Sequence, residues 1–121
     1  MLTIYHNPHC SKSRAALTML QEFSEQHQQP LQIIEYLKTP PSVTQLQTLL
    51  HQLDAPLETM LRQTEPDYQR LNLDDADATT VFNAIQTCPR LLQRPLVTDQ
   101  SRTIMARNAD DLTSWLKELE K

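Results

Sequence analysis

The chain contains no glycine among its 121 residues. Dinucleotide-binding loops and phosphate-binding loops need glycines so that the backbone can approach a phosphate closely, and this absence excludes their usual forms. A bound oxyanion would therefore have to be held by arginines and by a helix N-terminus. The sequence also lacks an apolar run of membrane-spanning length, and its first residues enter a strand pattern without the features of a signal peptide. We expect a soluble, cytoplasmic protein with no membrane partner.

Cysteine and positive charge are scarce as well. The two cysteines, Cys10 and Cys88, are too few for a secreted disulfide scaffold, so we expect a chemical role or simple burial for each. A formal net charge of −4 argues against a broad basic surface, and we expect no nucleic-acid partner. The length suits one domain, 1–121, with its own hydrophobic core.

The order of periodic segments predicts an α/β fold. "LTIY" at 2–5 and "LQIIEYL" at 31–37 flank a helical pattern, which is typical of a βαβ unit with parallel strands. Near the end, "RPLVTD" and "SRTIMAR" predict a β-hairpin, and "NADDLTSWLKELE" predicts an amphipathic helix with Asn108 as its N-cap. This order favours a thioredoxin-like domain with a four-stranded mixed sheet.

The middle of the chain is predicted to be a helical insertion at about 42–92. Ser42 is a suitable N-cap for the helix "VTQLQTLLHQL", and short helical patterns separated by prolines follow without a strand pattern. Cys88 ends one of these patterns just before Pro89, and we interpret it as a packing residue.

The chemistry of the chain points to Cys10, which lies where the first strand pattern ends and a helix pattern begins. A thiol is nucleophilic as the thiolate, and a helix N-terminus stabilises that anion with amide donors and a partial positive charge. His6, Lys12 and Arg14 lie close enough in sequence to add positive charge. We therefore favour a reactive Cys10 over a merely buried one.

The residues after Cys10 restrict its chemistry. "CSKS" has Ser13 at the position where a dithiol oxidoreductase has its second cysteine, so an adduct on Cys10 would need an external thiol. His6, His9 and Cys10 are metal-ligand types, but their spacing matches no zinc pattern and no fourth ligand is evident, so we expect no metal.

Arginine is the natural binder of oxyanions because its planar fork presents paired donors and stays charged. Arg94 is the best candidate from its context, since it stands directly before Pro95 at the start of a strand pattern. In thioredoxin-like folds a cis-proline at this junction faces the reactive cysteine.

Five ordered segments, which cover nearly the whole chain, resemble the glutaredoxin-linked arsenate reductases and their less characterised relatives. The segments are "IYHNPHCSKSR", "YLKTPPS", "LRQTEPDYQRL", "LLQRPLV" and "RTIMAR". The resemblance implies a nucleophilic Cys10 assisted by His6. It also implies an oxyanion site formed by Arg62, Arg94, Arg107 and Ser13.

The implied reaction is reduction of arsenate to arsenite through an adduct on the Cys10 thiolate. Glutathione and glutaredoxin are the implied partners, because they would supply the thiols that the chain lacks. Glutathione would be a co-substrate, and no bound cofactor is expected.

Two other functions stay open at this point. A monothiol enzyme of the same fold could act on another oxyanion, or on a mixed disulfide with glutathione or a protein, and the arginines would then matter little for a neutral disulfide. A redox regulator that binds RNA polymerase fits less well, since such regulators generally have a C-x-x-C pair and a glycine that this chain lacks.

Overall fold

The computed structural model describes residues 1–120 and divides into two compact units. The first unit combines Met1–Glu35 with the chain from Arg94 onward, and the second is Tyr36–Gln93. The second unit therefore interrupts the first in sequence, and the predicted insertion at 42–92 falls inside it.

A four-stranded mixed sheet forms the centre of the first unit, as predicted. The strand order is β2-β1-β3-β4, with β1 and β2 parallel and the pairs β1/β3 and β3/β4 antiparallel. The strands are β1 Leu2–His6, β2 Leu31–Glu35, β3 Leu96–Thr98 and β4 Thr103–Met105. The second strand was expected over 31–37 and is shorter, because the chain turns at Tyr36, ahead of Pro40 and Pro41. Every residue of β1 and of β3 is buried, as expected for the two inner strands of the sheet.

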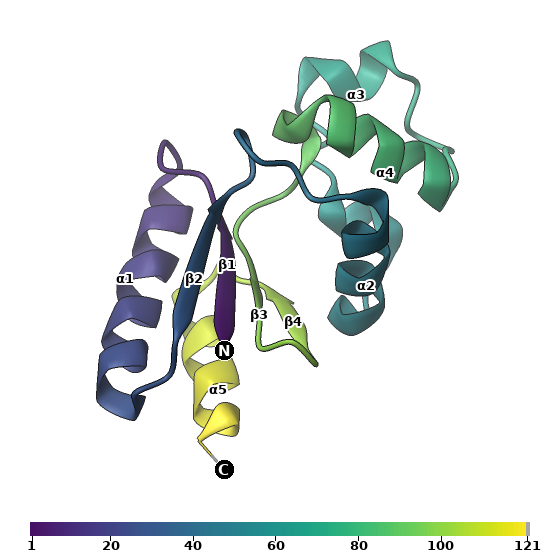
Figure 1. Cartoon of the computed structure of the whole chain (residues 1–121). Helices are drawn as coiled ribbons and strands as arrows, with labels where there is room; N and C mark the ends of the chain where they lie inside the picture. The colour runs from purple at the N-terminus through teal and green to yellow at the C-terminus, as the bar shows by residue number, and fades with distance from the viewer. Residues whose placement is uncertain (121) are drawn as a thin grey trace. The chain divides into compact units, whose positions relative to one another are not determined.

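Two helices pack against one face of this sheet, α1 Ser11–His27 and α5 Ala109–Leu119 (Figure 1). Their apolar side chains and alternate residues of β1 form the core of the unit, because successive side chains of a strand point to opposite faces. The core includes Leu2, Ile4, Ala16, Leu20, Phe23, Val97, Leu112, Trp115 and Leu116. Asn108 caps α5 as predicted, accepting from the backbone N–H of Asp110 at 2.8 Å and of Asp111 at 3.3 Å. The start of α1 is therefore held in place by the packing of this helix against the sheet.

The predicted hairpin between β3 and β4 forms without glycine. Gln100 takes the left-handed conformation, with φ of 81°, that glycine often supplies in such turns. The Asp99 carboxylate compensates by accepting from the backbone N–H groups of Ser101 at 2.9 Å and Arg102 at 2.6 Å. Burial raises the pKa of Asp99, but these hydrogen bonds and the charge of Arg102 outweigh it, so the pKa is lowered and the turn carboxylate stays ionised.

The second unit is helical, as expected. Its elements are α2 Val43–Leu53, η1 Leu57–Met60, α3 Pro66–Arg70, α4 Ala78–Thr87 and η2 Pro89–Leu91. Ser42 begins α2 with a reciprocal capping box, in which its side chain accepts from Gln45 N–H and the Gln45 side chain accepts from Ser42 N–H. An isolated bridge between Leu61 and Leu92 joins the two ends of the later helical segment. This bridge determines where the next residue, Arg62, is held.

Candidate active site

Cys10 is the N-cap of α1, directly after β1 and a short loop. Its backbone is extended, with φ of −101° and ψ of 122°, and its carbonyl accepts the first helical bond from Arg14 N–H at 3.0 Å. The loop before the helix is closed by a hydrogen bond in which Cys10 N–H donates to the Asn7 carbonyl at 3.1 Å. The side chain is 9% exposed. The sulfur is thus held at the positive end of a helix of 17 residues with limited access to water.

The surroundings of the sulfur favour the thiolate. Burial raises the pKa of the Cys10 thiol, but hydrogen bonding from the backbone N–H groups of Ser13 and Lys12 lowers it. The charge of Arg94 and a hydrogen bond from its side chain lower it further, and the net result is a pKa below the ordinary value. The sequence suggested the charges of His6, Lys12 and Arg14, but the largest contributions that lower it come from backbone N–H groups and Arg94. Lys12 acts through its backbone, and Arg14 instead donates to the Pro8 carbonyl at 3.0 Å.

His6 and Ser13 form a buried pair beside the reactive loop. His6 Nδ1 lies 2.6 Å from Ser13 Oγ, which also accepts from the backbone N–H of Asn7 at 3.0 Å. Burial lowers the pKa of His6, the facing Glu35 raises it and Arg14 lowers it, with a net decrease. His6 is therefore neutral at neutral pH, and its contact with the site runs through Ser13, whose backbone N–H serves the sulfur. Ser13 is fully buried, so its hydroxyl is part of the framework of the loop.

Arg94 and Arg107 are brought to the same end of the first unit. The peptide bond between Arg94 and Pro95 is cis, and it leads directly into β3, which pairs with β1. Arg107 follows β4, and its guanidinium Nη1 donates to the Arg94 carbonyl at 3.0 Å. The two arginines are 13 residues apart, and the hairpin between them is what places them together. The first unit thus assembles five of the predicted site residues: His6, Cys10, Ser13, Arg94 and Arg107.

Arg62, the remaining predicted residue, belongs to the second unit. Its backbone N–H donates to the Leu91 carbonyl at 2.8 Å, and its Nη1 lies 3.3 Å from the carboxylate of Glu65. Both side chains of this pair are mostly buried, 23% and 15% exposed, and Arg90 also approaches Glu65, at 3.9 Å. Glu65 is a partner that sequence reasoning did not single out, although its spacing of three residues from Arg62 was a usable signal.

Cys88, the second cysteine, is half-buried at the C-cap of α4, and both cysteines are free thiols. Arg70 Nη2 lies 3.7 Å from its sulfur, but the same guanidinium pairs with the Asp67 carboxylate at 3.0 Å. The carboxylate balances the charge that Arg70 would otherwise offer to a thiolate. Cys88 therefore has a cation nearby, but that cation is already paired with a carboxylate.

Within residues 1–120, no group of three or more histidine, cysteine, aspartate and glutamate side chains is arranged to hold a metal ion. No helix in the same range has the length and apolar character needed to cross a membrane. The arrangement that the first unit does provide is a thiol of lowered pKa beside Arg94, with Arg107 hydrogen-bonded to the Arg94 carbonyl. Chemically, this combination can attack an electrophilic centre whose oxygen atoms are negatively charged.

The chain is similar to known proteins over nearly its whole length. The ArsC family profile matches residues 5–114. An arsenate reductase from Neisseria meningitidis is 33% identical over 118 residues, which cover 95% of this chain and 97% of the relative. The solved structure of an arsenate reductase from Vibrio cholerae has a TM-score of 0.81 and 34% identity, covering 93% of this chain and 95% of that one.

A relative of lower identity is named as a transcriptional regulator and not as an arsenate reductase. The global transcriptional regulator Spx from Enterococcus faecalis is 28% identical over 118 residues, which cover 96% of this chain and 86% of the relative. The likeness to the solved arsenate reductases confirms the expected thioredoxin-like fold.

Proposed function

The chain belongs to the ArsC family of arsenate reductases, and from that premise we propose that it reduces arsenate to arsenite with Cys10 as the nucleophile. One observation supports this proposal above the others. The Cys10 thiol has a lowered pKa because backbone amides and Arg94 surround it, which is what an attacking thiolate needs. Arsenate is an oxyanion, and the same arginine that stabilises the thiolate can bind its oxygens.

In the first step the Cys10 sulfur forms a bond to arsenic, and one As–O bond breaks to release water. The arsenic remains As(V), because this step is a condensation and transfers no electrons. Arg94 and Arg107 would neutralise the charge on the remaining oxygens. His6 and Ser13 would keep the loop in the geometry that directs the Ser13 N–H at the sulfur.

The reduction itself needs two electrons, which two external thiols supply. A first thiol, glutathione, replaces a second oxygen on arsenic, again with loss of water. A second thiol, from glutaredoxin or glutathione, then attacks the glutathione sulfur, so that a disulfide forms and As(V) becomes As(III). Hydrolysis frees Cys10 and arsenite. Overall, arsenic acid and two thiols give arsenous acid, one disulfide and one water, which suits the reduced thiol pool of the cytoplasm.

The decisive experiment measures arsenite formation by purified protein with arsenate, glutathione and glutaredoxin. Cys10→Ser should reduce the rate to the uncatalysed background, a loss of roughly 10⁴-fold or more, because a serine hydroxyl is not ionised at neutral pH. Cys88→Ser is the matched control and should keep the wild-type rate. Arsenite formation by Cys10→Ser at the wild-type rate would contradict the proposal, as would an inactive wild-type protein whose Cys10 still alkylates readily.

The similarity to Spx favours one second candidate, a regulator that binds a component of the transcription machinery. The first unit contains a single cysteine, with Ser13 at the position of a possible partner, so this candidate would not sense oxidation through a local dithiol. Capture of RNA polymerase subunits by the purified chain would support it, and the absence of capture would leave arsenate reduction as the better assignment.

A further inference from the structure

A pocket in the second unit lies between the end of α3 and one face of α4. The residues that α4 contributes have the i, i+3, i+4, i+7 spacing that places side chains on one face of a helix: Thr80, Asn83, Ala84 and Thr87. Leu71 and Leu73, which follow α3, contribute apolar walls. We call this site the α4 pocket. All of its lining residues lie within Tyr36–Gln93, so it belongs to one unit.

The size and the walls of the α4 pocket suit a small molecule with an apolar body. Its volume is about 340 Å³, which falls within the range of roughly 300–1,000 Å³ that is usual for small-molecule sites. Leu73 is buried, and Leu71 and Ala84 are half-buried. An apolar group placed against these side chains would take the rest of their surface out of water, which favours binding.

The polar side chains that α4 contributes to the pocket already have partners. The Thr87 hydroxyl donates to the Asn83 carbonyl at 3.0 Å, and the Asn83 amide donates to the Thr79 carbonyl at 3.0 Å. The side chain of Thr80 is hydrogen-bonded to the N-cap carboxylate of the same helix. These hydrogen bonds direct the side chains toward α4 itself. Arg70 is the charged residue among those that line the pocket, so it is the group that can select a ligand by charge.

Arg70 gives the pocket a positive charge that the carboxylates of its ion-pair network do not fully balance. Its Nε and Nη2 donate to one oxygen of Asp67, at 3.1 and 3.0 Å, and the other oxygen of Asp67 accepts from Arg90 at 3.4 Å. Arg90 also approaches Glu65, which is paired with Arg62. Three guanidinium groups thus share two carboxylates, and one positive charge is left over. A ligand carboxylate is the complementary group, because a guanidinium offers several donors in one plane.

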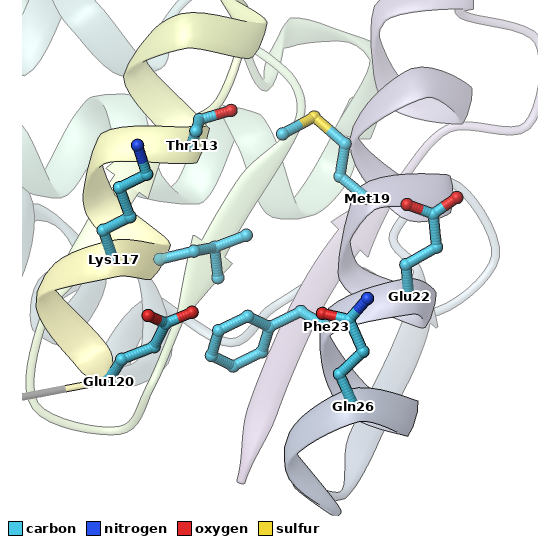
Figure 2. A pocket seen from close by; sticks show the side chains of 8 residues that line it. Met19, Glu22, Phe23, Gln26, Thr113, Lys117 and Glu120 are labelled. Atoms are coloured by element: carbon cyan, nitrogen blue, oxygen red, sulfur yellow. The ribbon is translucent and has the colours of Figure 1, made fainter.

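A groove between α1 and α5 of the first unit provides the contrast. This Phe23 groove has a volume of about 200 Å³, and Figure 2 shows Glu22 and Glu120 on opposite helices, either side of the Phe23 ring. Lys117 is its one basic lining residue, and Glu120 is also paired with His27 at 3.2 Å. Two carboxylates against one lysine disfavour an anion. An apolar acid is therefore expected to prefer the α4 pocket to the Phe23 groove.

We propose that the α4 pocket binds a small monocarboxylic acid with an apolar body, whose carboxylate pairs with Arg70 while the body lies against Leu73 and Ala84. Binding is non-covalent. The Cys88 sulfur lines the same pocket and lies 3.7 Å from Arg70 Nη2, so a bound acid would cover it. The inference does not depend on the proposed function, because no residue that lines the pocket is assigned to arsenate reduction.

The test titrates the full-length protein with 3-phenylpropionate and with its neutral analogue 3-phenylpropanamide, and follows the protein amide signals by NMR. The acid should bind about tenfold more tightly than the amide, because it alone forms a charge-assisted pair with the guanidinium. Arg70→Gln should remove this difference between the two probes. The variant should still fold, since Asp67 keeps its contact with Arg90.

A pair of matched variants tests the location of the probe. Thr87→Leu adds bulk to the α4 pocket and should weaken binding of the acid by about tenfold. Thr113→Leu is the control, because it makes the same change in the Phe23 groove and should bind the acid as the wild type does. Both threonines are exposed, and each donates to the carbonyl four residues earlier, so the two substitutions remove the same local contact.

Cys88 supplies a second readout. In the Cys10→Ser protein it is the one remaining thiol, and 3-phenylpropionate at roughly four times its Kd should slow alkylation of Cys88 by iodoacetamide about fivefold. The inference would be overturned by the absence of binding at millimolar concentration, by equal affinities of the wild-type protein for acid and amide, by equal affinities of Thr87→Leu and Thr113→Leu for the acid, or by alkylation of Cys88 at an unchanged rate.

Discussion

The two cysteines lie in different surroundings: Cys10 begins the long helix α1, whereas Cys88 ends α4 and directly precedes the three-residue η2. Cys10 is the N-cap of α1, where free N–H groups point toward the sulfur, whereas Cys88 is the C-cap of α4, where its own N–H donates to the Ala84 carbonyl at 2.7 Å. Each has an arginine nearby, but Arg94 acts on the Cys10 sulfur while Arg70 is paired with Asp67. An arginine close to a thiol is therefore insufficient when a carboxylate already pairs with it.

Among changes that leave both cysteines in place, the largest expected effect comes from removing the arginine near each cysteine in turn. Arg94→Ala should lower kcat/KM for arsenate by about 10²–10³-fold, because a charged donor is lost from both the thiolate and the oxyanion. Arg70→Ala removes the corresponding guanidinium near Cys88 and should leave arsenate reduction close to the wild-type rate. Steady-state kinetics of arsenite formation, with circular dichroism to verify folding, would measure both. Equal losses in the two variants would show that Arg94 has no special relation to Cys10.

The next effect concerns the titration of Cys10 itself. In the Cys88→Ser protein, the rate of alkylation by iodoacetamide reports Cys10 alone, and only the thiolate reacts. Since the pKa is lowered, the midpoint of the pH profile should lie below that of a free cysteine peptide, and Arg94→Ala should move it upward. An unshifted midpoint would contradict the role assigned to the helix N-terminus.

The same lowered pKa has a consequence for stability. A thiol whose pKa is lower in the folded state stabilises the fold above the pKa of the unfolded chain, and the contribution disappears as the pH falls through the folded-state value. Cys10→Ser should therefore lose stability relative to the wild type mainly at alkaline pH, as measured by urea unfolding across a pH series.

A smaller effect is expected from the framework of the reactive loop. Ser13→Ala removes the hydroxyl that contacts His6 and accepts from Asn7 N–H, which leaves a buried donor without its partner. The free energy of unfolding should fall by about 1–3 kcal/mol. Ser11→Ala, at an exposed position two residues earlier, is the control and should change it by no more than about 0.5 kcal/mol. An equal change in the free energy of unfolding for both variants would show that the Ser13 hydroxyl does not stabilise the loop.

The smallest effect is expected at the other end of α1, where a residue other than glycine has a left-handed backbone. Gln28 is the C-cap and has a left-handed backbone, with φ of 51°. Gln28→Gly should raise the free energy of unfolding by about 0.5–1 kcal/mol, because a side chain is disfavoured in that conformation. Gln26→Gly, inside the helix and exposed, should instead lower it by about 1 kcal/mol. Destabilisation by both variants would contradict this account of the helix end.

Much of the fold could be predicted from local patterns. The helix at 43–53 with its Ser42 cap, the Asn108 cap and the position of Cys10 at a helix start are confirmed by the structure. Each depends on residues within a few positions of one another, where capping chemistry and hydrophobic periodicity act directly. The end of β2 at Glu35 could not be predicted as well, since the apolar pattern continues into a turn.

The contacts within the candidate site could be predicted less well from the sequence, because they join segments that are far apart in the chain. The charge on Cys10 depends on Arg94, 84 positions later by number, and the contact of Arg107 with the Arg94 carbonyl depends on the hairpin between them. His6 illustrates the limit well. Its proximity to Cys10 in sequence suggested a charged partner, but burial in β1 lowers its pKa and its ring contacts Ser13 instead. The catalytic roles of His6, Ser13 and the three arginines remain predictions, and the Arg94→Ala experiment tests the one assigned to Arg94.

The sequence by itself determined the order of strands and helices, the helix caps and the placement of a lone thiol at a helix N-terminus, because these follow from short-range hydrogen bonding and periodicity. Only the tertiary structure decided which groups act on that thiol. Antiparallel pairing of β3 with β1 places Arg94 near the sulfur, and the hairpin between β3 and β4 brings Arg107 to the Arg94 carbonyl. Such proximity arises when segments far apart in the chain bury a common core, and no local pattern records it.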